Sequence, residues 1–170
     1  SDDFGMTGNY HEFSFGPTRD KEGNYYIGLN LASSGASIRP EIRGEFRHYG
    51  ISREQFYKNH RAGSGRMYSA TPYRGWIMKI APDGKTTPFA SGFRSPNGVN
   101  FDAQGRLWAT DNQGDWLGTS KLFHVKEGNF YGHPASLVWT DSWKKGRNPL
   151  KVPPSEFDAQ RTRAAVLFPQ

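Results

Sequence analysis

The chain has 170 residues, a formal net charge of +6 and no cysteine. This length is enough for one domain with a buried core, and the lack of cysteine excludes disulfides and thiolate metal sites. No run is long and apolar enough for a membrane span, and the first residues are not those expected of a signal peptide. Twenty glycines, eleven prolines and a 15% share of aromatic residues favour short strands and frequent turns over a helical protein.

Two segments repeat the same pattern of strand, turn and strand. In the first, residues 11–15 precede a turn at 20–23 and an apolar strand at 25–30. In the second, residues 98–101 precede a turn at 102–105 and a strand at 107–112. Each turn closes on a glycine, and each second strand ends on an asparagine. The pattern predicts two copies of one β-hairpin.

A second repeat follows each hairpin. Residues 76–84 resemble residues 121–128, and the closing glycines, Gly84 and Gly128, are 44 positions apart. That spacing matches the ~40–45-residue period of a four-stranded propeller blade. Residues 85–91 are expected to form an outer strand. We therefore predict an all-β fold of the β-propeller kind.

The predicted domain covers residues 1–170 as part of a single propeller. One blade spans residues 9–93 and carries an insertion at 32–74, and the next spans 95–138. Residues 139–170, with their apolar run at 164–168, are expected to start a further blade. These are about two and a half blades, whereas a closed propeller needs ~4–8. We therefore expect the chain to be a fragment of a longer protein; the alternative is that its blades assemble with other chains.

The insertion concentrates the positive charge. It carries three acidic residues against eight basic ones, which are Arg39, Arg43, Arg47, Arg53, Lys58, Arg61, Arg66 and Arg74. Such a segment could bind nucleic acid, but its aromatic residues follow no recognised motif, which favours a solvated insertion. Within it, Ser52 and Gln55 form a capping-box pattern that predicts a short helix from residue 53.

Three places carry candidate chemistry, because propellers bind ligands at the central channel and in the loops around it. The loop 92–98 presents Arg94, which could donate to a carboxylate or another anion, or lie in a plain surface turn. The loop 111–116 offers oxygen ligands for a hard cation such as calcium, or forms a hydrogen-bonded turn. His11 opens an innermost strand and is the best candidate general base of the five histidines. Its alternative is a structural role.

Three segments together resemble the glucose/sorbosone dehydrogenase family, namely residues 90–101, 105–112 and 128–134. Members carry a G-x-R-N-P-x-G loop and a later G-x-N-Y-G-W-P turn, which Gly92–Gly98 and Gly128–Pro134 resemble. The pattern is also similar to membrane-associated dehydrogenase-like proteins of planctomycete and verrucomicrobial type. This resemblance implies a six-bladed propeller that oxidises sugars with pyrroloquinoline quinone (PQQ) and calcium.

The resemblance also implies roles for individual residues. Arg94 matches the family's quinone-contacting arginine, and the same strand ends add Asn97 and Asn112 as candidate cofactor contacts. Gly114 and Asp115 fall near the loop that holds calcium. His11 lies near the catalytic histidine, which takes the proton of the sugar hydroxyl while hydride passes to the quinone. Arg94 would stabilise the charge that develops on the quinone oxygens.

The expected partners are a sugar or polyol substrate and a cytochrome-type electron acceptor, with a periplasmic or secreted location. We expect no nucleic-acid partner. Two alternatives stay open. One is a non-catalytic NHL-like propeller that binds a partner through the basic insertion. The other is a calcium-dependent lactonase of the gluconolactonase type, in which Asn97 would be the metal ligand.

Overall fold

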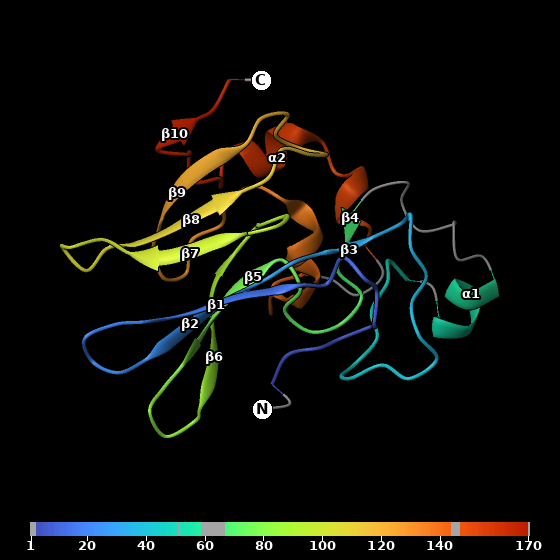
Figure 1. The fold of residues 1–170 in the computed structure, drawn as a ribbon. Coiled ribbons are helices and arrows are strands. Elements are labelled where there is room, and N and C mark those ends of the chain that lie inside the picture. The colour runs from blue at the N-terminus through green and yellow to red at the C-terminus, as the bar shows by residue number, and fades with distance from the viewer. Residues whose placement is uncertain (1–2, 51, 59–66, 144–146, 170) are drawn as a thin grey trace.

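The computed structural model describes residues 3–50, 52–58, 67–143 and 147–169, and its framework is two four-stranded antiparallel sheets (Figure 1). The first sheet has the order β1 (Ser14–Arg19), β2 (Tyr25–Leu29), β5 (Trp76–Ile80) and β6 (Thr86–Ser91). The second has the order β10 (Val166–Leu167), β9 (Lys121–Val125), β8 (Leu107–Asp111) and β7 (Gly98–Phe101). This arrangement fits partial propeller blades. Closure of a ring of six blades stays a prediction.

Both predicted hairpins are present, and an aspartate organises each turn. The carboxylate of Asp20 accepts the amide N–H of Asn24 at 2.8 Å. Asp102 accepts the amide of Arg106 at 2.9 Å in the second turn. Gly23 and Gly105 close the turns at φ +91° and +76°, which other residues rarely adopt. Local turn chemistry therefore fixes both hairpins.

The first strand differs from its predicted position. Residues 11–15 were expected to form it, but β1 begins at Ser14 and runs on to Arg19. Its register with β2 shifts between Phe15 and Thr18, around Gly16 and Pro17, since proline has no N–H for the ladder. His11 consequently lies in the turn before the innermost strand.

The main core fills the space between the two sheets. Tyr26 and Ile77 of the first sheet pack with Ala109 and Phe123 of the second, around the buried ring of Phe93. The innermost strands β1 and β7 lie side by side, and Thr18 donates to the Asn100 side chain at 2.9 Å. Apolar burial on one face of each sheet thus holds the two sheets together.

The C-terminal strand lies elsewhere than predicted. Residues 139–170 were expected to start a further blade, but β10 pairs with β9, Val166 opposite Leu122. It is therefore the outer strand of the second sheet. The chain leaves that sheet after Val125 and returns through three short helices, η1 (Pro134–Trp139), η2 (Pro149–Lys151) and α2 (Pro154–Asp158). A sequence pattern does not show which sheet edge a distant strand joins.

The predicted insertion is a folded excursion between β2 and β5. It contains a two-stranded sheet, β3 (Ala32–Ser33) with β4 (Met67–Tyr68), and the helix α1 (Arg53–Lys58). The hydroxyl of Ser52 accepts the Gln55 amide at 3.1 Å, and the Gln55 side chain accepts the Ser52 amide at 2.7 Å. The predicted capping box is confirmed. The basic residues Arg61 and Arg66 lie outside the described residues.

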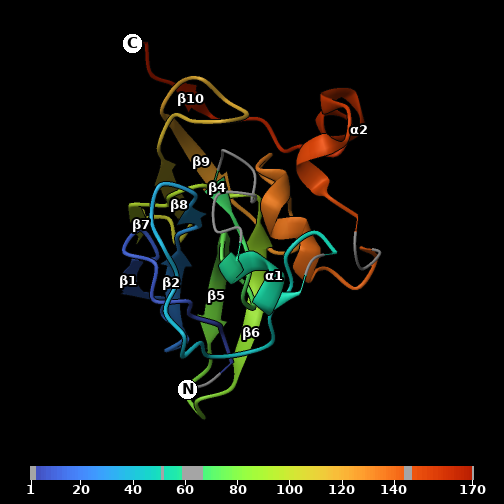
Figure 2. The ribbon, with the colours of Figure 1, turned by 90° about the vertical axis from the view of Figure 1, so that its right-hand side faces the viewer.

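The excursion packs against the η1 segment at the end of the molecule opposite the hairpin turns (Figures 1 and 2). Arg47 donates to the carbonyl of Val138 at 2.9 Å, and the Trp139 indole donates to Ser69 Oγ at 2.9 Å. A buried ion pair, Arg74 with Glu12 at 4.0 Å, ties its last residues to the N-terminal segment. None of the described helices is long and apolar enough to cross a membrane.

Candidate functional site

The backbone of Arg94 is held through both its amide and its carbonyl. Asp111, the last residue of β8, accepts the amide of Arg94 at 3.2 Å and that of Ser95 at 2.6 Å. The Arg94 carbonyl accepts the Leu31 amide at 3.0 Å. A strand-end carboxylate therefore positions the predicted arginine, because its two oxygens replace the partners that a loop backbone otherwise lacks.

Asp111 is itself neutralised by Lys121. Lys121 Nζ lies 3.6 Å from Asp111 Oδ2, and both side chains are almost fully buried. Burial lowers the pKa of Lys121, and the carboxylate of Asp111 opposes that shift. The charges of this pair offset each other, and Arg94 lies beside it with a second carboxylate, Asp115, lining the same hollow. Sequence reasoning missed Lys121, which opens an apolar strand and carried no motif of its own.

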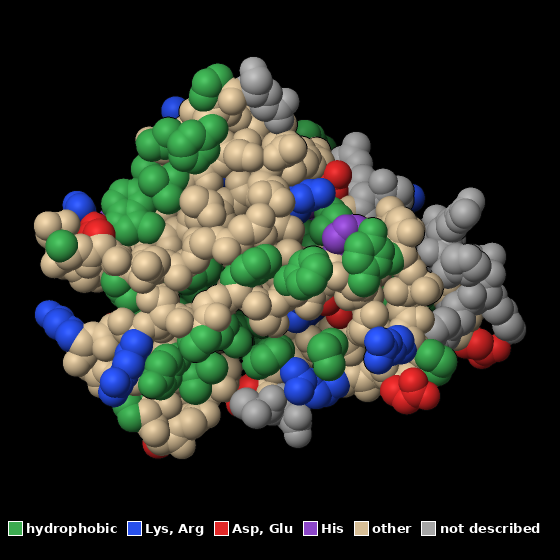
Figure 3. Space-filling view, in the orientation of Figure 1, with side chains coloured by type: hydrophobic (Ala, Val, Ile, Leu, Met, Phe, Trp, Pro, Cys, Tyr) green, Lys and Arg blue, Asp and Glu red, His purple; other side chains and the backbone are tan. Residues whose placement is uncertain are grey.

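A cavity of about 490 Å³ opens at the ends of these strands. His11, Arg94, Asn97 and Asn112 all line it, so four of the six predicted site residues come together. Its volume is in the range of small-molecule sites. Phe13 is half exposed beside it, and Figure 3 shows hydrophobic side chains and a histidine together on one face. The cavity thus combines one cation, an imidazole, amides and apolar rings.

His11 is held by the insertion. Its ring Nδ1 lies 2.6 Å from Ser33 Oγ, and its amide donates to Asn9 Oδ1 at 3.1 Å. The Asn9 side chain donates in turn to the Ser33 carbonyl at 3.0 Å. Nε2 of His11 makes no hydrogen bond with any residue that the structure describes. The imidazole is therefore oriented by Ser33 and keeps one nitrogen for a ligand.

Asn97 and Asn112 join the loops that follow β6 and β8. Asn97 Nδ2 donates to Asn112 Oδ1 at 2.8 Å. The other two side-chain amide atoms, Asn97 Oδ1 and Asn112 Nδ2, then have no hydrogen bond to other described side chains. This pair presents one acceptor and one donor to the cavity.

Gly114 and Asp115, the predicted calcium residues, lie outside this cavity in an adjoining hollow that shares Arg94 with it. A side chain at Gly114 would overlap Arg94, so the arginine packs directly on that glycine. Asp115 Oδ2 accepts the Met67 amide at 2.8 Å and lies 3.6 Å from His133 Nε2. Burial favours the neutral form of Asp115, but His133, the Met67 amide and the charge of Arg94 together outweigh it and lower the pKa.

His133 was expected only as part of a turn, and it is buried against Asp115. Its Nδ1 accepts the Ala135 amide at 3.3 Å at the start of η1. Burial lowers the pKa of His133, opposed by Asp115. The imidazole therefore lies against Asp115, and both residues line the hollow. The local sequence does not predict this contact, since Asp115 lies in the loop after β8 and His133 lies just before η1.

The residues around Gly114 and Asp115 do not fit a calcium ion as they are arranged. Calcium takes six to eight oxygen ligands, whereas Asp115 is already engaged and Arg94 and Lys121 line the same hollow. In the described ranges, no three His, Asp or Glu side chains cluster in a way that could hold a metal. The unpaired Nε of Arg94 is buried without a partner among the described groups, which fits an anion. Calcium binding stays a prediction.

Comparison with solved structures finds distant, partial similarity. One solved structure, described as a crystal structure of glucose dehydrogenase, matches 70% of this chain at 13% identity with a TM-score of 0.41. A second, described as glucose dehydrogenase, matches 89% at 13% identity with a TM-score of 0.46. The chain spans only 30% and 37% of these two proteins. No family model and no curated protein matches the sequence.

Proposed function

We propose that this chain forms part of a quinoprotein-like dehydrogenase that oxidises a sugar or another polyol. The observation that carries the proposal is the strand-end cavity, which collects His11, Arg94, Asn97 and Asn112 from separate parts of the sequence. A site lined by an imidazole, one arginine and side-chain amides suits a polar anionic cofactor and a hydroxyl substrate.

The described residues fit PQQ, a planar polycarboxylate. Arg94 would hold a carboxylate or quinone oxygen, since its buried Nε lacks a hydrogen-bond partner within the described structure. Asn97 and Asn112 would add one acceptor and one donor. When bound, the cofactor supplies a quinone that accepts a hydride.

The remaining chemistry belongs to the protein. Nε2 of His11 would take the proton of the substrate hydroxyl, because Ser33 engages the other ring nitrogen. Phe13 and Phe15 would exclude water from one side of the cavity. We also propose a cytochrome-type acceptor in a periplasmic or secreted setting, since a reduced cofactor must pass its electrons on.

The test is a PQQ titration of the purified protein, with and without calcium, followed by the absorbance of the quinone. Reduction of an artificial electron acceptor is then measured across aldoses and sugar alcohols. Arg94→Ala should weaken quinone binding roughly 10- to 100-fold, the usual loss for a hydrogen bond to a charged group. Arg106→Ala is the matched control, because Arg106 belongs to the Asp102 turn away from the cavity.

His11→Gln should retain quinone binding and lose turnover. Absence of quinone binding by the folded protein would overturn the proposal and favour the binding-scaffold alternative. Equal loss in Arg94→Ala and Arg106→Ala would show that binding is a diffuse charge effect.

A further inference from the structure

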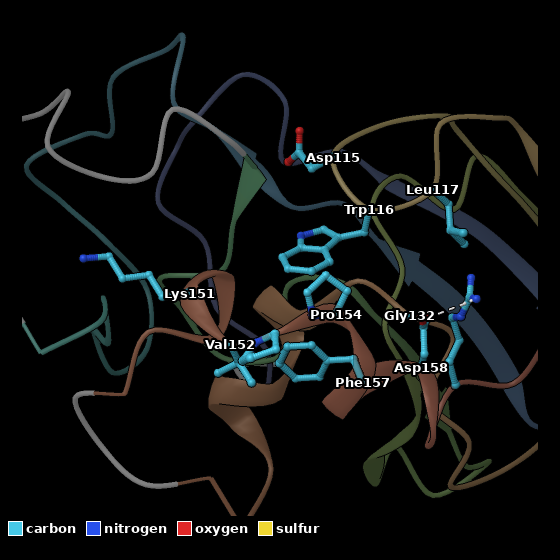
Figure 4. A pocket seen from close by; sticks show the side chains of 11 residues that line it. Asp115, Trp116, Leu117, Gly132, Lys151, Val152, Pro154, Phe157 and Asp158 are labelled. Atoms are coloured by element: carbon cyan, nitrogen blue, oxygen red, sulfur yellow. Dashed lines mark ion pairs between the residues drawn. The ribbon is translucent and has the colours of Figure 1, made fainter.

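A second hollow, of about 580 Å³, lies between the loop after β8 and the segment that precedes β10 (Figure 4). It shares no lining residue with the cavity that carries the proposed function. Its apolar lining comes from both segments, namely Trp116 and Leu117 from the loop and Val152, Pro154 and Phe157 from the later segment. It is therefore a separate candidate site, although it shares Asp115, Trp116, Leu117 and Gly132 with the hollow beside Gly114.

The floor of the hollow is aromatic and firmly supported. The rings of Trp116 and Phe157 meet edge to face, with centroids 5.8 Å apart and an interplanar angle of 78°. Phe157 is buried, packs on Phe130 and stacks with Trp143. In Figure 4 the indole of Trp116 lies beside Pro154, with Phe157 on the other side of that proline. A flat apolar surface is thus available beside the opening.

The rim of the hollow is charged but balanced. Arg161 Nη2 pairs with Asp158 Oδ1 at 3.1 Å, and Arg161 Nε is buried with no hydrogen-bond partner among described atoms. A side chain at Gly132 would overlap Arg161, so the guanidinium stem is packed in place. Lys151 and Asp115 complete the rim. The rim thus holds two carboxylates and two cationic side chains, and its formal net charge is zero.

This combination selects a class of ligand. A simple anion would need uncompensated cations, and Arg161 already has a carboxylate partner. A purely apolar ligand would leave the charged rim without hydrogen bonds. A saccharide ring has an apolar C–H face for an indole, and hydroxyls that donate to Asp158 and accept from Arg161.

We propose that this hollow binds a neutral saccharide unit, stacked on Trp116 and hydrogen-bonded by the Asp158–Arg161 pair. It is a binding subsite apart from the reacting centre, and its occupancy does not require a cofactor. An oligosaccharide or the glycan of a larger partner would be anchored here.

The experiment measures binding of maltotriose and cellotriose to the purified protein by ligand-observed saturation-transfer NMR and calorimetry, without quinone or electron acceptor. Trp116→Leu keeps the site apolar but removes the flat ring, and should weaken binding roughly tenfold. Trp108→Leu is the matched control, because Trp108 lies in the second sheet and donates to Asp102 at 2.8 Å. Asp158→Asn, at an exposed rim position, should also weaken binding, whereas Asp83→Asn in an exposed turn should not.

Near-ultraviolet circular dichroism establishes that each variant is folded, and Asp158→Asn keeps the test decisive if Trp116→Leu unfolds. Binding of neither trisaccharide, or equal binding by Trp116→Leu, Asp158→Asn and wild type, would overturn the proposal. Competition by citrate stronger than by saccharide would show an anion site instead. The binding assay contains no quinone and no electron acceptor. A lack of saccharide binding would therefore overturn this proposal without bearing on the proposed dehydrogenase activity.

Discussion

The burial of His48 predicts that the free energy of unfolding falls at acidic pH. The side chain is 2% exposed, and neither ring nitrogen has a hydrogen-bond partner among the described residues. It is enclosed by aromatic rings, with centroids of Tyr49, Phe56 and Tyr68 at 4.3, 4.7 and 5.0 Å. Burial lowers the pKa of His48 from 6.5 to about 4, since removal from bulk solvent disfavours the charged imidazole.

The size of the effect follows from that shift. The unfolded chain binds a proton at His48 near pH 6.5, and the folded chain does so only near pH 4. Acid therefore favours the unfolded state throughout that interval, and the free energy of unfolding falls as the pH drops. A shift of this size, at ~1.4 kcal/mol per pH unit, corresponds to a loss of about 3 kcal/mol between neutral pH and pH 4.

His48→Phe removes the titrating group and keeps a ring in the aromatic cluster. We expect urea denaturation at pH 7, 5.5 and 4 to show a flatter pH dependence in the variant, with stability at pH 7 unchanged or higher. Some acid loss will persist, because burial also lowers the pKa of His133. His124→Phe is the control, since His124 stacks on Trp108 in the second sheet and the variant keeps His48. Equal acid loss in wild type and His48→Phe would refute the reasoning.

Three further predictions concern stability. Arg74→Met should lower the free energy of unfolding by ~3–5 kcal/mol in urea titrations, because it leaves Glu12 buried without its cation; adding Glu12→Gln should restore much of the loss. Asp111→Ala should both destabilise the fold and weaken quinone binding, since two loop amides lose their acceptor and Lys121 loses its carboxylate; unchanged hydrogen exchange at those amides would contradict this. Ser52→Ala should cost ~0.5–2 kcal/mol of local helix stability, seen as faster exchange in α1 with no change in the sheets.

The parts of the fold that could be predicted from the sequence are those encoded by neighbouring residues. The hairpin turns follow from Asp20 with Gly23 and Asp102 with Gly105, and the α1 cap follows from Ser52. The pairing of β10 with β9 could not be predicted, because the two strands are far apart in sequence and both read as ordinary apolar runs.

In the candidate site, too, the residues of a local motif could be predicted and the contacts between distant segments could not. Arg94 and Asn97 were recognisable because a stiff loop with Pro96 presents them after a strand. His11 lines the same cavity, but from a turn that Asn9 and Ser33 organise across the insertion. Such contacts join distant segments, and nothing in the local pattern of either segment encodes them.

The late return of β10 has a consequence for biosynthesis. The ribosome releases β7, β8 and β9 well before Val166, so β9 first exists as an open sheet edge. The carbonyl of Leu122, which accepts the Ala165 amide at 2.9 Å in the finished fold, is then available to any other strand. Unpaired edges of this kind invite pairing between nascent chains. Until the C-terminal segment pairs with β9, the second sheet therefore keeps an edge at which such pairing can occur.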